Sequence, residues 1–487
     1  MKLKGNKILQ HVAVIITVLA AYVLARAAGL ENNGCRSLRI VCLFVMTTGM
    51  IVLIRYFGYL TKGEDTEAKQ VVGLILILGV ILRINYMLYT PCTVRANDLW
   101  ALDTNSYGHA AYILNIMLEG QLPPHNFIQF YQQPLFYLFG AAASWVVNGI
   151  LGTFDNYSLV DAAKTVSCIA SCVSLLAARS IFEECGLSGK GLYKALILIA
   201  FLPAYFLTGG RVAPDALVGM FMILALLYTI RWMKDKSWKN TILLALIYGC
   251  GVLTKISCAS LALGTAVVFL LSFVDAVKKR EWKGLLRKYV VFGLISLPLG
   301  LWYSVRNYIL FRQPLNYVLR QPDDGELYTG YKSIAQRILV VKLDNLFADP
   351  YTKVTEDYNL PVYALKSSLF GEFRFENWGW IVVLLLMFAF LLSALCVIAV
   401  IRCIRYQRKE KWCMFLLLAA VLFYGSMALF YLGYPSGCSM DFRYMLFLPV
   451  PMAYLFGKCE LFPEKNWERY TDLCCLGFAA ASCMMYC

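Results

Sequence analysis

Residues 97–140 contain an unusual concentration of side chains that can exchange protons. The ionisable residues of this segment include Asp98, Asp103, His109, Glu119 and His125. A helix would place His109 and Tyr112 on one face, because they are three residues apart. A positioned carboxylate can remove the proton from a hydroxyl or an amine and so turn it into a nucleophile. Asp98 and Asp103 are therefore candidate general bases.

The same residues also have purely structural interpretations. Asp103 or Thr104 can cap a helix that Gly120 would end. Glu119, near that end, would then simply be a solvated surface residue. His109 can equally be a packing or hydrogen-bonding residue. Asp98 has no capping or pairing role that the sequence reveals, and it follows closely on a predicted membrane span. Both carboxylates stay candidates, and Asp98 is preferred.

Several cations occur where an apolar chain does not ordinarily carry them. Lys255 lies between two apolar runs, and Arg211, Arg306 and Arg443 fall at predicted outer helix ends. Ionisable residues in or beside membrane spans are costly and usually functional. The alternative is that these long side chains reach the lipid headgroups. Asp215 stands at a predicted helix start, where it can serve as a cap beside the positive end of the helix dipole.

The composition places these residues in an integral membrane protein. Hydrophobic residues make up 60% of the 487 residues and charged residues 15%, against about 45–50% and 25% in soluble proteins. The net charge of +15 is explained by Lys and Arg in cytoplasmic loops, which orient membrane helices. It therefore does not indicate a nucleic-acid partner. The cysteines show no metal-ligand spacing, and the sequence leaves a divalent-metal requirement open.

Apolar runs of about 20 residues predict an all-α membrane fold with about 13 transmembrane helices. The predicted spans are 8–28, 38–60, 71–90, 160–179, 191–208, 214–232, 240–255, 256–273, 288–304, 378–401, 411–432, 443–458 and 470–486. The segment 133–152 is interpreted as interfacial or re-entrant, because a full crossing would export the basic end of the following span. Two outer loops remain. One is 91–132, with amphipathic juxtamembrane helices, and the other is 305–377, which is long enough to hold helices of its own.

The order of short motifs along the chain resembles a known family. The matching residues are Asp98, His109, Tyr112, 120–123 (GQLP), Tyr131, 134–137 (PLFY), 211–217 (RVAPDAL), 251–255 (GVLTK), 301–307 (LWYSVRN) and Arg443 with Tyr444. They resemble the GT-C membrane glycosyltransferases. The nearest branch is bacterial glycosyltransferase family 39, which is related to the protein O-mannosyltransferases and the aminoarabinose transferases. Leu99 stands where the family often has a second acid, and Gln133 replaces the first proline of a P-P-L motif.

The resemblance implies transfer of a sugar from a polyprenyl-phosphate donor to a glycan, lipid or protein acceptor. The reaction would take place at the outer face of a bacterial plasma membrane. Asp98 or Asp103 would be the base, and a single displacement would invert the anomeric carbon. Cations would neutralise the leaving phosphate, and the candidates are Lys255, Arg306, Arg211 and Arg443. The residues expected to shape the site are His109, Tyr112, Tyr131 and Asp215.

The sequence predicts four regions that follow one another along the chain. Two added helices occupy 1–70, a GT-C-like module with the catalytic loop 91–132 occupies 71–304, an external region follows in 305–377, and the C-terminal helices fill 378–487.

Two other functional classes stay open. A transporter or a flippase for lipid-linked glycans would place its essential charges near mid-bilayer and show repeat symmetry, whereas few charges lie inside the predicted spans. An O-antigen-type ligase or polymerase would rely on a late loop with Arg and His, and no histidine follows His125.

Overall fold

The computed structural model describes residues 2–30, 36–59, 65–323, 325–340, 346, 358–372, 379–461 and 465–487. Every regular element in these ranges is a helix. The chain divides into two compact units that interleave along the sequence. Unit 1 comprises Met1–Ala27, Cys92–Ala177 and Arg211–Leu319, and unit 2 comprises Ala28–Pro91, Ala178–Gly210 and Arg320–Cys487. The consecutive boundaries at 70, 304 and 377 remain predictions.

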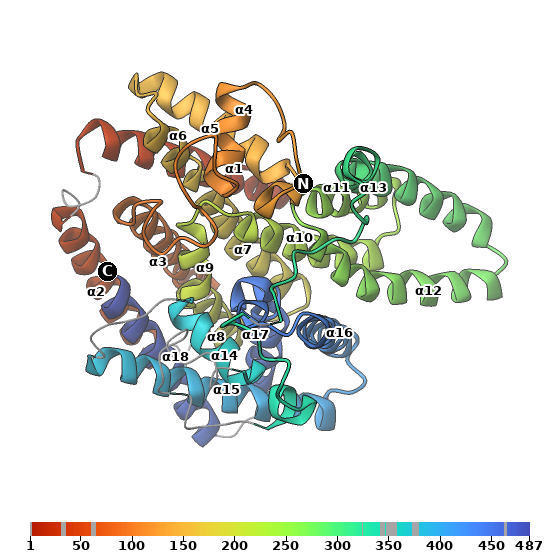
Figure 1. The fold of residues 1–487 in the computed structure, drawn as a ribbon. Coiled ribbons are helices and arrows are strands. Elements are labelled where there is room, and N and C mark those ends of the chain that lie inside the picture. Colours follow the sequence, from red (N-terminus) through yellow and green to blue (C-terminus); the bar gives the residue numbers. More distant parts are fainter. Residues whose placement is uncertain are drawn as a thin grey trace. The chain divides into compact units, whose positions relative to one another are not determined.

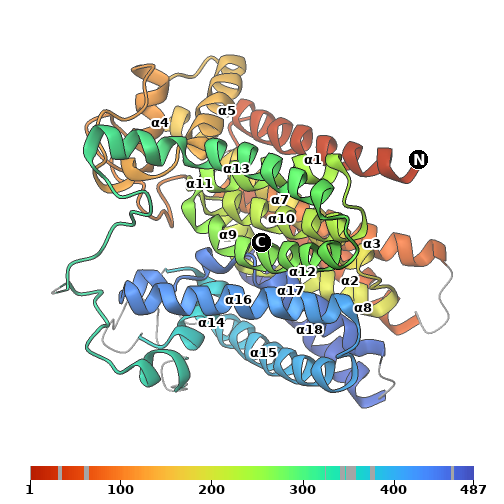
Figure 2. The same ribbon diagram turned by 90° about the vertical axis from the view of Figure 1, so that its right-hand side faces the viewer.

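Unit 1 contains the first outer loop and a group of long helices that follow it. Its elements are α1 (Lys2–Ala27), α4 (His109–Leu118), η2 (Ile128–Tyr131), α5 (Leu135–Leu151), α6 (Asn156–Ala162), the start of α7 (Lys164–Glu184), α10 (Asp215–Lys234), α11 (Trp238–Thr254), η3 (Ile256–Leu261), α12 (Ala262–Lys278) and α13 (Trp282–Phe311). Helix α11 packs between α10 and α13 (Figures 1 and 2). Gly300 on α13 permits this close packing, since a Cβ there would lie 3.0 Å from the Cβ of Val252 on α11.

Unit 2 holds most of the remaining helices. They are α2 (Arg36–Tyr59), α3 (Asp65–Tyr89), α8 (Gly189–Phe201), α9 (Pro203–Gly209), η4 (Ala335–Leu339), α14 (Leu360–Phe370), α15 (Trp380–Tyr406), α16 (Lys411–Gly433), η6 (Gly437–Met440), η7 (Phe442–Met445), α17 (Pro449–Lys458), η8 (Cys459–Leu461) and α18 (Lys465–Tyr486). Pro203 separates α8 from α9, and the two helices meet at 41°. Arg83 on α3 donates hydrogen bonds at 2.9 Å to the carbonyl oxygens of Ile199 and Ala200. The break leaves these carbonyl groups without helical partners.

Nine helices in the described part of the chain are long and apolar enough to cross a membrane, or ten if the bent pair α8–α9 is one span. The all-helical membrane fold is therefore confirmed, whereas the predicted number of thirteen spans is not. The predicted span 240–255 corresponds to α11, which has 17 residues. The predicted span 443–458 contains α17, which has only 10 residues. The last predicted span falls on α18, whose first half is charged.

The first outer loop differs in detail from the expectation. Helix α4 begins at His109 with Gly108 as its N-cap, whereas the sequence suggests a cap at Asp103 or Thr104. Gly120 follows the end of α4 in the left-handed region, at φ +64°, as predicted. Helix α5 has 17 residues, fewer than the about 20 that a span needs. Its length favours the interfacial interpretation of 133–152.

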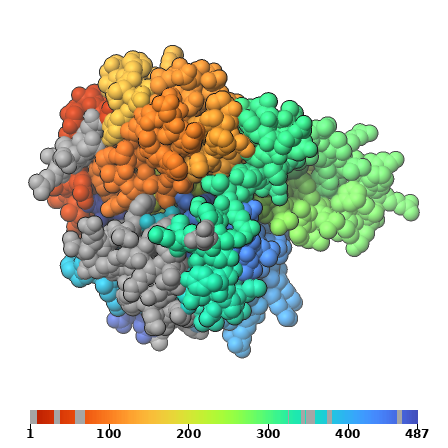
Figure 3. Space-filling view, viewed as in Figure 1, coloured from red at the N-terminus to blue at the C-terminus, as the bar shows by residue number. Residues whose placement is uncertain are grey.

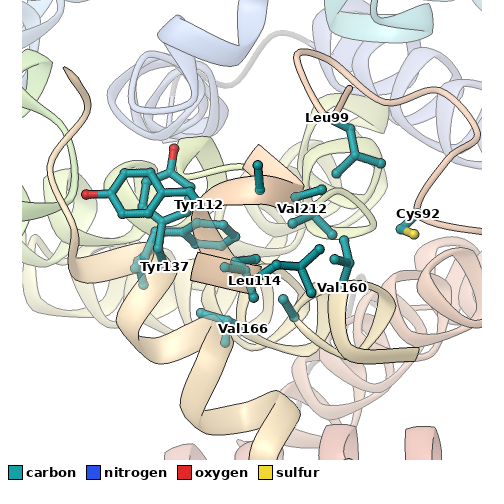
Figure 4. Packing of buried hydrophobic residues seen from close by; sticks show 14 of the residues in the cluster. Cys92, Leu99, Tyr112, Leu114, Tyr137, Val160, Val166 and Val212 are labelled. Carbon is teal, nitrogen blue, oxygen red and sulfur yellow. The ribbon is translucent and has the colours of Figure 1, made fainter. Parts of the chain in front are cut away.

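Helix α4 lies in the core of unit 1. All residues from His109 to Asn115 are buried, and apolar side chains from α5, α6, α7 and α10 surround them. Tyr112 overlaps the ring of Tyr137 at one side of this cluster, with Leu114 beside them (Figure 4). The sequence predicts a helix lying along the membrane surface. Because seven of the ten residues of α4 are apolar, it is instead enclosed by its neighbours.

The second predicted outer loop, 305–377, contains helical structure, as its length suggested. Helix α13 continues into it as far as Phe311, and η4 and α14 lie further along. Residues 324, 341–345, 347–357 and 373–377 of this region lie outside the described residues.

Candidate functional site

The start of the first outer loop is held by the carboxylate of Asp161 on α6. One of its oxygens accepts a hydrogen bond from the amide of Cys92 at 2.9 Å, and the other accepts one from the hydroxyl of Tyr22 on α1 at 2.6 Å. Lys164 lies 2.8 Å from the same carboxylate. All these groups are buried, so each has lost its water and depends on the others. Asp161 thus holds the point at which the chain enters the loop.

Asp98 occupies a strained segment of the loop. Arg95, Asp98 and Trp100 all have left-handed backbones, with φ of +52°, +55° and +64°, a region that residues other than glycine seldom adopt. The carbonyl oxygen of Asp98 accepts a hydrogen bond from the amide of His109 at 2.9 Å, so the first turn of α4 holds this residue. The Asp98 side chain is exposed. Figure 3 shows the loop (orange) at the surface of unit 1.

Gly108 makes this arrangement possible, although the motifs did not single it out. A Cβ on Gly108 would lie 2.7 Å from the carbonyl carbon of Leu99 and 2.7 Å from the Cβ of Trp100. Any side chain at this position would therefore push the 98–100 backbone away from α4. The signal in the sequence was a glycine directly before the expected helical stripe.

Asp103 has a different environment from Asp98. Its Oδ1 accepts hydrogen bonds from the backbone amides of Asn105 and Ser106, at 2.8 and 2.9 Å. This is the pattern of an aspartate that stabilises a turn in its own chain. Its carboxylate thus has a local structural role, as the capping interpretation suggested, although in a turn rather than at the start of α4.

A chain of hydrogen bonds links His109 to the segment after the Pro-Pro break. His109 Nδ1 lies 2.8 Å from the hydroxyl of Tyr137, and that hydroxyl donates to Oε1 of Gln132 at 3.3 Å. Gln132 in turn donates to the side-chain oxygen of Gln129. Tyr137 and Gln132 were not among the predicted site residues.

Tyr137 also stacks on a second aromatic ring of the site, and two of the acids of the site act on its hydroxyl electrostatically. Its ring stacks on Tyr112, with centroids 3.7 Å apart and planes inclined by 8°. Burial raises the pKa of the Tyr137 hydroxyl well above its ordinary value, and Tyr131, Asp215, Tyr303 and Asp98 raise it further. Asp98 and Asp215 therefore both lie close enough to Tyr137 to act on it electrostatically. The hydroxyl stays protonated and can serve as a hydrogen-bond donor.

Lys255 and Asp215 form an ion pair between two separate motifs. Lys255 Nζ lies 2.6 Å from Oδ1 of Asp215, and the two side chains are 15% and 6% exposed. Asp215 is the first residue of α10, where the helix dipole favours a negative charge. Lys255 is the C-cap of α11, where the dipole favours a positive one. The packing of α10 against α11 therefore brings together a cation and a carboxylate that are 40 residues apart.

Arg306 connects the end of α13 to the first outer loop. Its guanidinium donates to the carbonyl oxygen of Pro123 at 3.0 Å and to Oδ1 of Asn307 at 2.9 Å. Tyr303, one turn earlier, donates to the carbonyl oxygen of Phe130 at 3.0 Å. These contacts place Arg306 beside the first outer loop. They also give it a structural role there.

The remaining predicted site residues are distributed as follows. Arg211 is buried directly before α10. Tyr131 is half-buried, and its ring meets Tyr317 edge-on, with centroids 5.3 Å apart. Arg443 belongs to unit 2, where its guanidinium lies 3.3 Å from Asp441 and 3.9 Å from Glu372. Unit 1 therefore contains every predicted site residue except Arg443.

His125 has an aromatic environment in the same loop. Its ring is stacked against both Phe127 and Phe130, with centroids 5.0 and 5.2 Å away, and Tyr107 approaches it edge-on. Burial lowers the pKa of His125 below its ordinary value of 6.5, so the ring is neutral at physiological pH. Within the described residues, no group of three His, Cys, Asp or Glu side chains has an arrangement suited to a metal ion.

Residues 141–302 match the family model described as "Dolichyl-phosphate-mannose-protein mannosyltransferase". The matched segment includes Arg211, Asp215 and Lys255. It confirms the resemblance to the GT-C membrane glycosyltransferases. Together with the apolar helices, the match supports a membrane glycosyltransferase, although it covers less than half of the chain.

Two further comparisons complete this result. No curated protein matches the sequence. Among solved structures, the chain is similar to "Crystal Structure of ArnT from Cupriavidus metallidurans in the apo state", with 13% identity over 80% of this chain and 77% of that chain, and a TM-score of 0.40. A likeness of this size carries no argument about the site.

Proposed function

We propose that the protein transfers a sugar from a polyprenyl-phosphate donor to an acceptor hydroxyl or amine, at the outer face of a bacterial plasma membrane. The main support is that the motif residues other than Arg443 and Tyr444 lie in unit 1 and that several of them contact one another. The Tyr137 hydroxyl contacts His109 and lies within electrostatic reach of Asp98 and of Asp215, which is paired with Lys255. The family match adds support, because its description names a dolichyl-phosphate sugar, which is a polyprenyl-phosphate donor.

In this proposal Asp98 is the general base. Its exposed carboxylate removes the proton from the acceptor as the acceptor oxygen or nitrogen attacks the anomeric carbon of the donor sugar. The bond between the anomeric carbon and the phosphate oxygen breaks, and the polyprenyl phosphate leaves with that electron pair. One carboxylate and one displacement invert the anomeric carbon. Asp103 is the weaker candidate, because its Oδ1 already accepts two backbone hydrogen bonds.

The leaving phosphate gains negative charge, which nearby cations stabilise. Lys255 is the preferred partner. Its ion pair with Asp215 holds the ammonium group at the ends of two helices before the donor arrives. Arg306 is the second partner, and its contact with Pro123 fixes its position beside the loop. Arg211 and Arg443 stay predicted phosphate ligands. His109, Tyr112 and Tyr131 would shape the acceptor side.

The purified full chain, supplied with polyprenyl-phosphate sugars and a mixed acceptor pool, tests this proposal. Asp98→Asn should lower the transfer rate by about 10²- to 10⁴-fold, the usual contribution of a general base. Asp103→Asn is the matched control, and it should retain most of the activity while unfolding at a lower temperature. The measurements are released polyprenyl phosphate, the anomeric configuration of the product and the thermal unfolding midpoint.

Two results would overturn the proposal at different levels. Full transfer by Asp98→Asn would eliminate Asp98 as the base and leave the reaction class standing. If wild type releases no polyprenyl phosphate from any donor but moves a lipid-linked sugar across a vesicle membrane unchanged, the protein is a flippase rather than a transferase.

A further inference from the structure

The turn between α12 and α13 carries a dense group of cations that the proposed reaction does not use. They are Lys278, Lys279, Arg280, Lys283, Arg287 and Lys288, here named the basic turn. All except the half-buried Lys288 are exposed. The nearest acids in the sequence are Asp275 and Glu281. Figure 1 shows this turn (light green) at the far end of the α12–α13 hairpin.

The short connection between α10 and α11 enlarges this charged surface. Lys288 donates a hydrogen bond to the carbonyl oxygen of Lys236, and its ammonium lies 5.8 Å from the ring of Trp238. Lys236 itself lies 5.6 Å from the ring of Trp232. These contacts bring Lys236 and Lys239 to the basic turn. Tryptophan next to lysine is typical of a helix end at the membrane–water interface.

The cations of the basic turn are not neutralised by the protein. In the part of the chain that the structure describes, no ion pair joins them to a carboxylate. The inner lysines of unit 2 behave differently, since Lys194 lies 2.8 Å from Glu460 and 2.7 Å from Asp472. The basic turn therefore has unbalanced positive charge, which attracts an anionic partner.

The surface next to the basic turn is apolar. Leu271 and Val277 on α12 are 61% and 47% exposed, and Val290 and Leu294 on α13 are 52% and 68% exposed. Cations beside an exposed apolar strip match a molecule that has both an anionic head and a hydrocarbon tail. A soluble acidic protein or a nucleic acid would match the charge but would leave the apolar strip in water.

From this combination we infer that the basic turn is a binding site for anionic phospholipids of the membrane leaflet. The headgroup phosphate contacts the cations, and the acyl chains cover the exposed faces of α12 and α13. Each cation near an anionic bilayer contributes favourably to such binding.

The site also has a consequence for the rest of unit 1. Helix α11 begins at Trp238 and ends beside Lys255, about 25 Å away at 1.5 Å per residue. Helix α13 likewise begins in the basic turn and carries Arg306 near its other end. Bound lipid thus steadies the helices that carry the candidate site, whatever reaction that site performs.

The test uses the purified full chain in detergent and a short-chain phosphatidylglycerol as the probe. Binding is measured by native mass spectrometry and by the rise in the thermal unfolding midpoint. We expect Lys278→Gln/Lys279→Gln/Arg280→Gln to bind this lipid about a hundredfold more weakly, because each cation near an anionic surface contributes about fivefold. The matched control is Arg405→Gln/Arg408→Gln/Lys409→Gln, which removes three exposed cations from unit 2. It should bind like wild type.

The comparison of probes separates the possible occupants. Phosphatidylcholine of the same chain length tests the apolar strip alone, and inorganic phosphate tests the charge alone. If wild type binds phosphatidylcholine as tightly as phosphatidylglycerol, or binds inorganic phosphate as tightly, the inference is wrong. Equal loss of binding in the two triple variants would reduce the effect to net charge and would also overturn it. The comparison of probes on wild type remains decisive if a variant does not fold.

Discussion

The backbone of Asp98 is fixed by the contacts around it. Three left-handed residues in the segment 95–100 cost of order 1–3 kcal/mol each, and they persist because the surrounding contacts leave no alternative. The amide of His109 binds the Asp98 carbonyl, and Leu99 is buried in the core of unit 1. Strain of this kind is common at functional sites.

Gly108→Ala tests whether this backbone positions the base. The added Cβ would meet the carbonyl carbon of Leu99 at 2.7 Å, so we expect a loss of stability of about 1–3 kcal/mol, typical of overpacking. We also expect at least a tenfold lower transfer rate at temperatures where the variant is folded. Gly149→Ala is the control, because a Cβ there would meet nothing within 4 Å. A stable Gly108→Ala with wild-type activity would contradict this role.

The Lys255–Asp215 pair can be examined by a double-mutant cycle. Lys255→Met and Asp215→Asn should each cost about 3 kcal/mol, because each removes one member of a buried ion pair. The double variant should regain much of that stability but none of the transfer activity. Arg320→Met serves as the control, because the Arg320–Asp323 pair is 59% exposed on both sides and should contribute less than about 1 kcal/mol. Simple additivity of the two single effects would show that the pair is not coupled.

At the scale of the elements, helix α1 has a structural role that the sequence did not predict. The resemblance begins near residue 70 and treats the first two helices as an addition. In the structure, α1 belongs to unit 1 and α2 to unit 2. Tyr22 on α1 binds Asp161, and Arg26 donates to the hydroxyl of Ser158 at 2.8 Å. Helix α1 therefore supports α6 and, through Asp161, the start of the first outer loop.

Tyr22→Phe removes this support without changing the shape of the side chain. The Asp161 carboxylate would lose a 2.6 Å hydrogen bond in a buried place. We therefore expect a loss of about 2 kcal/mol and faster hydrogen exchange at the amide of Cys92. Tyr56→Phe is the control, because its hydroxyl binds Gln70 in an exposed position, and it should change neither quantity. Unchanged exchange at Cys92 in Tyr22→Phe would show that α1 does not hold the loop.

At the scale of the whole molecule, the proposed function places the two ends of the long helices of unit 1 at opposite membrane faces. Helices α10, α11 and α13 carry the candidate site at one end and cations at the other. The lengths of α10 and α13 suit a bilayer crossing. In the proposed orientation, the site at one end would meet the lipid-linked donor and the acceptor outside the cytoplasm, and the basic turn would keep the opposite end of the helices inside.

Cysteine labelling tests this sidedness in intact cells. Asn105→Cys, in the first outer loop, should react with a membrane-impermeant maleimide added outside. Lys279→Cys, in the basic turn, should react only after permeabilisation. Both positions are exposed, and most of the native cysteines are buried, so wild type provides the background. Reaction of both variants from the same side would contradict the proposed orientation.

The sequence alone determined that the chain is a helical membrane protein and where most of its long helices lie. Helix formation in a bilayer depends on the length of an apolar run, which is a local property. The order of short motifs was also sufficient to indicate the family that residues 141–302 match. The number of spans does not follow from composition alone, because short helices such as α11 and α17 share the composition of a span without its length.

The tertiary structure decided which of these residues meet. Lys255 pairs with Asp215, Tyr137 joins His109 to the site, and Arg443 lies in the other unit. None of these relations follows from a local pattern, because each depends on which helix ends come together across long stretches of chain. The same holds for Asp98 and Asp103. Two similar loop carboxylates acquire different environments because one lies where α4 binds the backbone, and the other forms a turn.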